Sequence, residues 1–431
     1  RNGGESIIDL GESCDFNSVI LKEKGLNVQK FSISVSDDNE NFTQIYANDK
    51  IEFHRLCTFD TVKARYVKLT VEKSDNLPKI REMEIYNAVP EKKNDFRVST
   101  YSTLGGSVFG IIDDTTLSDA EKDAKIKELI DADYYDTVTD YIDIGNVRWD
   151  EEGIIHTDGW DGIERDEDKY YAVMMRNLHE VLDEKGVNLV ITILNPSGEN
   201  GNQRVMKSIT ENRDTLITNM IAFANKYEFD GIDLDWEFPL SQDEFDAYNS
   251  FLQELKARMK TEMWNKEDAT LSLALATWAL KYTPETIECI DYVNVMGYDI
   301  LDQDGQHSSF FSSCVQAADY IEIQGFSKEQ INIGFPFYGT WEGGRMEQYA
   351  YNAISEEISP FNNFYTMKKS DTKEDRYTYF NSQAIIRDKT AYAYLKGYGG
   401  VMIFSQYCDL PSDDERSLTK AISDYLQEVT K

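Results

Sequence analysis

The sequence is poor in the residues that build metal centres and disulfide frameworks. Its 431 residues include only five cysteines and four histidines, and no two cysteines form a CxxC pair. This usage argues against a zinc cluster and a regular disulfide framework, so we expect neither a metal ion nor a cofactor.

The chain also begins with Arg1 and shows no apolar leader. We therefore expect a fragment or a processed product whose export signal lies outside this sequence.

Long apolar runs and positive charge are also scarce. No run of about 18 apolar residues is present, so we expect no membrane insertion. The formal net charge at pH 7 is −34, and such an acidic chain repels phosphate backbones. Nucleic acid is therefore excluded as an expected partner. Apolar residues nevertheless make up 41% of the chain, which is enough to bury a large core.

Residues 1–90 are predicted to form an all-β module. Short segments with alternating apolar and polar residues are separated by turn-forming residues, and no long helical pattern interrupts them. The strand candidates are residues 31–35, 42–46, 66–71 and 83–86. Most of the acidic excess falls after residue 90. We therefore predict a linker over residues 91–96 and a second domain over residues 97–431.

In that second region, strand-like segments alternate with helical ones. The strand candidates are residues 97–101, 140–144, 187–193, 229–237, 271–277, 292–298, 331–337 and 400–404. Helical patterns lie near residues 118–132, 167–185, 207–228 and 242–262. This alternation predicts an α/β fold with a closed (β/α)8 TIM barrel. A doubly wound open sheet is the alternative, but no GxGxxG or GxxxxGK[ST] phosphate-binding loop supports it.

The most informative segment, DGIDLDWE at residues 230–237, has acids at every second position near its end. Side chains on a strand alternate between its faces, so Asp233, Asp235 and Glu237 would share one face, about 6.5–7 Å apart. With the intervening apolar residues facing the helices, the carboxyls would point into the barrel, where like charges cannot all ionise. Glu237 would lie at the C-terminal end of the strand, where barrel active sites occur. A carboxyl that keeps its proton there is a candidate general acid.

Two other interpretations of these acids are open. An acidic strand that faces solvent is disfavoured by the Ile, Leu, Trp and Phe residues interleaved with the carboxylates. A divalent-metal site would use the same acids, but it lacks the histidine partners or the Asp/Asn–Gly loop of the usual sites.

The DGxDxDxE pattern at residues 230–237 resembles that of the family 18 glycoside hydrolases, the chitinases. Three later segments resemble the same family in order: VMGYD at 295–299, GFPFYG at 334–339 and YGGVMIF at 398–404. The resemblance covers about residues 97–425. Trp236 and the following Phe-Pro are more similar to the chitinases than to the endo-β-N-acetylglucosaminidases of this family.

The resemblance implies retaining, substrate-assisted hydrolysis of β-1,4-linked N-acetylglucosamine polymers, chitin or chitooligosaccharides. Glu237 would be the general acid/base, and Asp235 would hold the N–H of the substrate's 2-acetamido group. Tyr298 would donate its phenol to the acetamido oxygen, and Asp233 would share a proton with Asp235. The resemblance also implies substrate contacts for Tyr101, Trp236, Met296, Asp299 and Phe404.

The sequence departs from the family pattern at the walls of this pocket. The eighth strand ends in Phe404, where the family usually has Trp. The third strand reads TILNPSG at 192–198, where the family usually has Ser-x-Gly-Gly. Few residues separate Gly339 from Tyr377, too few for the family's full α+β insertion. We therefore expect a cleft that is shallower on one side and cleavage within polymer chains.

Residues 1–90 resemble discoidin, or coagulation factor 5/8 type C, modules, which are jelly-roll-like β-sandwiches. The resemblance rests on IIDLG at 7–11, FSISVSDD at 31–38, ARYVKL at 64–69 and IREMEIY at 80–86. The match begins partway into that fold, so we expect the first strands of the module to lie outside this chain. A sugar-binding module and a purely structural one are both open, and no binding residue is assigned.

The leading hypothesis is an extracellular or cell-surface, monomeric hydrolase whose partner is an N-acetylglucosamine-containing polysaccharide or glycan. Alternatives of the same class are an endo-β-N-acetylglucosaminidase acting on N-glycans and a peptidoglycan hydrolase. An alternative of another class is a catalytically inactive chitinase-like lectin. Such lectins typically lack the acid at the position of Glu237, which is present here.

Overall fold

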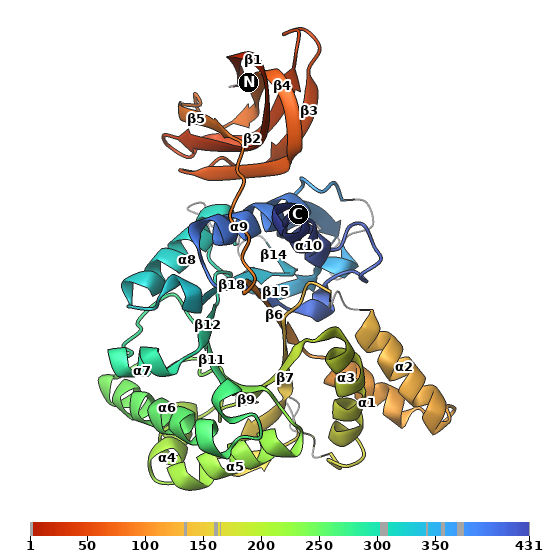
Figure 1. Ribbon diagram of the computed structural model, residues 1–431, viewed down its shortest axis with the longest axis vertical. Coiled ribbons are helices and arrows are strands. Elements are labelled where there is room, and N and C mark those ends of the chain that lie inside the picture. The colour runs from red at the N-terminus through yellow and green to blue at the C-terminus, as the bar shows by residue number, and fades with distance from the viewer. Residues whose placement is uncertain are drawn as a thin grey trace.

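The chain forms an N-terminal antiparallel sheet followed by a barrel of parallel strands surrounded by helices (Figure 1). The computed structural model describes residues 3–132, 136–158, 163, 165–301, 309–341, 344–354, 358–368 and 375–430.

Eight parallel strands close the barrel in the order β6-β18-β13-β12-β11-β10-β9-β7, and β7 pairs again with β6. They are β6 (Arg97–Ser102), β7 (Asp140–Trp149), β9 (Asn188–Leu194), β10 (Gly231–Leu234), β11 (Thr270–Leu275), β12 (Tyr292–Val295), β13 (Ile331–Pro336) and β18 (Gly400–Phe404). A two-residue strand, β8 (Ile155–His156), pairs in antiparallel orientation with the end of β7. The predicted TIM barrel is confirmed, because closure of the ring excludes the open sheet.

Helices cover the outer face of the barrel (Figure 1). They are α1 (Gly105–Asp113), α2 (Asp119–Asp131), α3 (Tyr171–Lys185), α4 (Gly201–Thr210), α5 (Arg213–Lys226), α6 (Gln242–Glu262), α7 (Pro284–Cys289), α8 (Phe311–Ile323), α9 (Gln383–Lys396) and α10 (Leu418–Thr430). Two residues near the start of α6 cap the helix. The Ser241 side chain accepts a hydrogen bond from the Glu244 N–H, and the Glu244 carboxylate accepts one from the Ser241 N–H. This reciprocal capping box satisfies two N–H groups that a helix start leaves unpaired.

The helix predicted near residues 207–228 is instead two helices, α4 and α5. Glu211 and Asn212 separate them, and the backbone of Asn212 has left the helical conformation. The Asn212 side chain donates a hydrogen bond to the carbonyl of Glu151, which fixes the break against the loop that follows β7. A short polar side chain bonded to backbone competes with helical hydrogen bonding, so the periodic pattern alone missed this break.

The N-terminal region is all-β, as predicted. Its antiparallel sheet has the order β3-β2-β4-β1-β5. The strands are β1 (Gly4–Glu23), β2 (Val28–Ser36), β3 (Thr43–Asn48), β4 (Arg55–Ser74) and β5 (Ile80–Tyr86). Alternate residues such as Phe31 and Ile33 are fully buried, in an apolar cluster to which the strands of this sheet contribute most members. The alternation of apolar and polar residues predicted β2, β3, β4 and β5, but it did not predict the long β1.

The two regions share apolar contacts. Leu56 of β4 packs into the apolar cluster of the barrel, and Ala384 of α9 packs into that of the N-terminal sheet. Figure 1 shows this sheet beside α9, joined to β6 by a chain segment, residues 87–96, without regular secondary structure. The proposed domain limits at residues 90 and 97 stay a prediction, and the structure adds a packed interface across them.

The segment between β13 and α9 forms a small sheet of its own. Its antiparallel order is β15-β14-β17-β16, from β14 (Tyr338–Trp341), β15 (Gly344–Ala350), β16 (Phe364–Lys368) and β17 (Asp375–Tyr379). This segment begins at Tyr338, which lines a cavity at the carboxyl ends of the barrel strands. The expectation of a shallower cleft and of cleavage within chains stays a prediction.

Candidate active site

A cavity of about 580 Å³ opens at the carboxyl ends of the barrel strands. In (β/α)8 barrels this end is the usual place of the active site, because the loops after the strands converge there. The lining comes from the ends of six strands or the segments that follow them: Tyr101, Ile144, Asp235, Glu237, Phe238, Ala274, Ala276, Thr277, Trp278, Met296, Tyr298, Asp299, Ile300 and Phe404, with Tyr338 of β14.

Most of the residues predicted for catalysis or substrate binding lie together in this lining: Tyr101, Asp235, Glu237, Met296, Tyr298, Asp299 and Phe404. Trp236 is not part of it. Its side chain is buried on the opposite side, where Nε1–H donates to Asn202 and the ring packs edge-on against Tyr248 of α6. Because neighbouring residues of an extended segment point to opposite sides, Trp236 faces the helices and has no path to a ligand in the cavity.

Asp233 lies beneath the cavity on β10 and is fully buried. Its Oδ1 accepts a hydrogen bond from Ser272, and its Oδ2 accepts from Thr192 and Tyr101, at 2.6, 2.8 and 3.0 Å. Desolvation raises the pKa of this carboxyl, although the three hydroxyl donors act in the opposite direction. Asp233 is thus bonded to the neighbouring strands β9 and β11 and to β6, which is not adjacent to β10. The proton that it was predicted to share with Asp235 stays a prediction.

Asp235 follows the last residue of β10 and meets the cavity with an unsatisfied oxygen. Its Oδ1 is buried and has no hydrogen-bond partner among the described residues. Desolvation is the main reason that its pKa lies well above the ordinary value, and the charges of Glu237 and Asp233 raise it further. A buried polar atom without a partner is unusual and costly, so this oxygen is available to a group that a ligand brings.

Glu237 opens into the cavity two residues further along. The predicted strand over residues 229–237 is shorter in the structure, where β10 ends at Leu234, so Asp235 and Glu237 lie on the segment that leaves the strand. Partial desolvation raises the pKa of Glu237, and the negative charge of Asp299 raises it further. A carboxyl in these surroundings keeps its proton to higher pH and can donate it to a substrate.

Aromatic rings form the floor of the cavity around Phe404. Tyr298 stacks on Phe404 with ring centroids 5.7 Å apart, and Tyr101 and Tyr338 meet the same ring edge-on at 5.9 and 6.3 Å. Burial raises the pKa of all three tyrosines, so their hydroxyls remain protonated. The Tyr338 hydroxyl donates to Asp299 Oδ1 at 2.9 Å. The floor therefore combines apolar faces with phenol groups that can donate hydrogen bonds.

Sequence reasoning missed part of this lining. Tyr338 comes directly after the strand candidate 331–337, and Trp278 comes directly after the candidate 271–277. Trp278 is 46% exposed and meets Phe238 edge-on, with ring centroids 4.8 Å apart. The signal that could have found both residues is their position just beyond a barrel strand, on the face where such sites form.

The remaining sequence-based expectations concern metals, thiols and membranes. In the part of the chain that the structure describes, no group of three or more His, Cys, Asp or Glu side chains could hold a metal ion. The five cysteines are free thiols. Across the same described ranges, no helix has both the length and the apolar composition that crossing a membrane requires.

Comparison with known proteins identifies both regions. The family model for glycosyl hydrolases family 18 matches residues 184–409, and the model for the F5/8 type C domain matches residues 3–83. Among curated relatives, chitinase A1 of Niallia circulans is 27% identical over 269 residues, which is 48% of this chain and 38% of that protein. The chain spans between 9% and 55% of the lengths of the curated relatives considered.

Solved structures show the same fold at low identity. The family 18 chitinase ChiB from the chitin utilization locus of Flavobacterium johnsoniae superposes with a TM-score of 0.57 at 20% identity, covering 78% of this chain and 96% of that one. A group IV chitinase of Ostrinia furnacalis, solved in complex with allosamidin, superposes with a TM-score of 0.58 at 17% identity, covering 78% and 100%.

Proposed function

The chain belongs to the glycosyl hydrolases of family 18, and on that premise we propose that it cleaves β-1,4-linked N-acetylglucosamine polymers, chitin or chitooligosaccharides, with retention of configuration. The observation that carries this proposal is the pair of Asp235 and Glu237 in the cavity. Both carboxyls have raised pKa values, and the effects that shift them are desolvation and neighbouring carboxylates. The reaction needs a carboxyl that can deliver a proton in the cavity, which the raised pKa of Glu237 favours, and a second carboxyl with an oxygen that can accept a hydrogen bond from the substrate.

In the proposed mechanism Glu237 protonates the glycosidic oxygen. A second carboxylate acting as nucleophile would have to lie on the opposite side of the sugar, about 5–5.5 Å from the acid. Asp235 leaves the same strand as Glu237, so it approaches from the same side. The nucleophile is then the oxygen of the substrate's own 2-acetamido group, which closes on the anomeric carbon as the leaving group departs. Glu237 finally removes a proton from the water that opens this intermediate.

We propose that two residues hold the acetamido group during this step. Asp235 offers its partnerless Oδ1 to the acetamido N–H. Tyr298 lies in the same lining, and its protonated hydroxyl can donate to the acetamido oxygen. Fixing the amide at both ends turns the attack into a positioned intramolecular step.

The substrate class follows from the surface that the cavity offers. The rings of Tyr101, Tyr298 and Phe404 give an uncharged floor on which a sugar ring can lie. The acidic chain disfavours polyanionic substrates. The Ostrinia chitinase of the same fold was solved with allosamidin, so we propose that allosamidin also binds the cavity of this protein. We further propose a monomer that acts at or outside the cell surface, since a polymeric substrate of this size is met there.

The mechanism is tested by the anomer first released from chitopentaose, followed by proton NMR in the first seconds of reaction. Retention is expected, together with no cleavage where a de-N-acetylated sugar occupies the subsite beside the cleaved bond. An inverted anomer, or efficient cleavage of cellulose oligomers, contradicts the mechanism.

Cleavage within chains is tested separately: the viscosity of a soluble chitin derivative should fall faster than reducing ends appear.

The alternatives predict different products from the same protein. An endo-β-N-acetylglucosaminidase releases glycans from an N-glycoprotein, and a peptidoglycan hydrolase releases muropeptides, while chitooligosaccharides stay intact in both cases. A lectin binds allosamidin and cleaves none of the three substrates. We favour hydrolysis because Glu237 opens into the cavity with a raised pKa.

A further inference from the structure

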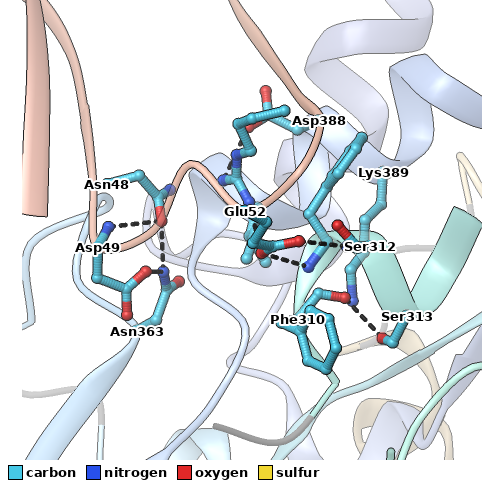
Figure 2. Close-up of polar contacts among 12 residues, drawn as sticks. Asn48, Asp49, Glu52, Phe310, Ser312, Ser313, Asn363, Asp388 and Lys389 are labelled. Atoms are coloured by element: carbon cyan, nitrogen blue, oxygen red, sulfur yellow. Dashed lines mark hydrogen bonds and ion pairs between the residues drawn. The ribbon is translucent and has the colours of Figure 1, made fainter. Parts of the chain in front are cut away.

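The N-terminal sheet reaches into the barrel region through the loop between β3 and β4. Glu52 of this loop is buried, and its carboxylate accepts the backbone N–H groups of Phe311 at 3.2 Å and Ser312 at 2.6 Å. These are the first two residues of α8, so a carboxylate from the module caps a helix of the barrel (Figure 2). Negative charge at a helix start is favourable, because the N–H groups there lack partners within the helix.

Arg55 holds Glu52 in this position from the module side. One guanidinium nitrogen of Arg55 lies 3.8 Å from Glu52 Oε1, and the other lies 3.2 Å from Asp388 on α9. The guanidinium also lies over the ring of Phe311, 5.1 Å from its centroid. All of these charged groups are buried, so the contact between module and barrel has a defined geometry that water does not screen.

Ser309, two residues before α8, connects this contact to the cavity. Its carbonyl accepts hydrogen bonds from Lys389 at 2.7 Å and from Asn381 at 3.1 Å. Its hydroxyl accepts the backbone N–H of Asp299 at 2.9 Å. Asp299 and its neighbour Tyr298 both line the cavity, so one short path of contacts leads from Glu52 to the proposed active site.

The backbone along this path is held in unfavourable conformations. Glu52, Asp299 and Ser309 have φ angles of 62°, 56° and 58°, in the left-handed region that residues with a Cβ rarely adopt. Such conformations are unfavourable and persist only where the surroundings over-determine them. The contacts from the module are part of those surroundings, and removing them should let this backbone relax.

We propose that Glu52 is a positioning residue of the active site, through which the N-terminal module fixes the start of α8, Ser309, and with them Asp299 and Tyr298. The proposal rests on the proposed function for its kinetic consequences. It assigns the module a role in arranging the site, independent of whether the module binds sugar.

The kinetic test compares Glu52→Ala and Glu52→Gln with a matched control, Glu23→Gln. Glu23 is also buried and accepts two backbone N–H groups, those of Asn27 and Val28, but entirely within the module. We expect Glu52→Ala to lower kcat on chitopentaose about 10- to 100-fold, since small displacements of reacting groups cost that much, with KM changed less than about threefold. Glu52→Gln keeps one acceptor and should recover part of kcat, and Glu23→Gln should resemble wild type.

The pH profile adds a readout that a general loss of stability would not move. The groups that face Glu237 are Asp235, Asp299 and Tyr298, together with Tyr338 through its bond to Asp299. Asp299 raises the pKa of Glu237, and the proton donor must be protonated to act. If Asp299 moves away in Glu52→Ala, the basic limb of kcat/KM should shift to lower pH. The limb should stay in place in Glu23→Gln.

Hydrogen exchange read by mass spectrometry tests the same path without any substrate. In Glu52→Ala we expect faster exchange both at residues 311–313 and at residues 299–301, whereas Glu23→Gln should change neither segment. This readout stands even if the wild type fails to cleave chitopentaose, so failure of the proposed function and failure of this inference are distinguishable. Faster exchange at 311–313 with residues 299–301 unchanged overturns the inference, as does a Glu52→Ala variant with wild-type kcat and pH profile.

Discussion

Two carboxylates with raised pKa values, the fully buried Asp388 at the module interface and the half-buried Asp235 in the cavity, differ in the groups that surround them. Asp388 accepts hydrogen bonds from the Tyr46 hydroxyl at 2.5 Å, from the N–H and hydroxyl of Thr58 at 2.7 and 2.8 Å, and from Arg55 at 3.2 Å. Asp235 has one oxygen that no described residue contacts by a hydrogen bond, and its charged neighbours are the carboxylates Asp233 and Glu237. Both oxygens of Asp388 therefore have partners within the protein, whereas Asp235 has an oxygen that a ligand could engage.

The two carboxylates respond to the same desolvation in different ways. Burial raises the pKa of Asp388 only to about 6, because Arg55, Tyr46 and Thr58 stabilise the charged form. Burial raises the pKa of Asp235 well above its ordinary value, and the neighbouring charges act in the same direction. Burial alone therefore does not distinguish a structural carboxyl from a chemical one. The partners do, because removing a paired buried group leaves its partner's charge uncompensated, whereas an unpaired group stays available for a reaction.

The largest expected effect is the loss of turnover in Glu237→Gln. The amide keeps the size of the side chain and removes its transferable proton, and general acid catalysis contributes about 10²–10⁴-fold. Hydrolysis of chitopentaose should fall by at least that factor, while allosamidin binding measured by calorimetry should persist. Glu211→Gln, on the surface at the end of α4, is the control and should leave turnover unchanged. Retention of more than about a tenth of wild-type turnover would show that Glu237 is not the acid.

The comparison predicts opposite outcomes for Asp235→Asn and Asp388→Asn. The first should lower kcat on chitopentaose at least about 100-fold with little change in the free energy of unfolding, because no internal partner is lost. The second should lower the free energy of unfolding by about 3 kcal/mol, because it removes a partner of the buried Arg55 charge. Urea denaturation and steady-state kinetics on both variants measure the two quantities. Equal losses in the free energy of unfolding in the two variants would contradict a structural role for Asp388 and a chemical role for Asp235.

A smaller effect is expected on the pH dependence of Asp299→Asn. The amide can still accept the hydrogen bond from Tyr338, but it no longer carries the negative charge that raises the pKa of Glu237. Glu237 then loses its proton at lower pH, so the basic limb of kcat/KM should move to lower pH. The acidic limb serves as the internal reference. A basic limb that stays in place or moves upward would mean that Asp299 does not act on Glu237.

The smallest expected effect is that of Thr58→Val at the interface. The valine removes the hydroxyl donor to Asp388 and keeps the backbone N–H bond and the approximate side-chain volume. A hydrogen bond to a charged group contributes about 1.5–3 kcal/mol, and the remaining donors should keep the loss in the free energy of unfolding at the lower end of that range. Thermal and urea unfolding measure it. A loss as large as that of Asp388→Asn would indicate that the other donors contribute little.

The fold could be predicted from the sequence because its signals are local. The eight barrel strands were located from short apolar segments, and β10 could be placed because the acids alternate with Ile232 and Leu234. The cavity lining could be predicted for residues at or just beyond the end of a barrel strand: Phe404 is the last residue of β18, and Tyr298 and Asp299 follow β12. The substrate contact expected for Trp236 came from the family resemblance, whereas the alternation of side chains along the segment already turns this residue toward the helices, where the structure has it.

The interface could not be predicted, because its partners are far apart in the sequence. Glu52 and Arg55 occur in a stretch without clear periodicity, and nothing local indicates that one meets α8 and the other α9. Asp388 and Lys389 are consecutive charged residues, and charged side chains usually lie at the surface, yet both are fully buried. Desolvation lowers the pKa of Lys389 to about 8, a consequence that only the packed structure reveals.

The segment between β5 and β6, residues 87–96, lacks regular secondary structure, and Val89 within it is 83% exposed. It offers a protease an easy point of cleavage, but cleavage there would sever one peptide bond and leave the ion pairs and the shared apolar contacts in place. The two pieces would therefore stay associated as a nicked complex. In evolution, exchange of the module by recombination at this segment would likewise require a donor that supplies counterparts of Glu52 and Arg55. The unit that can be inherited and shuffled intact is therefore larger than either half of the chain.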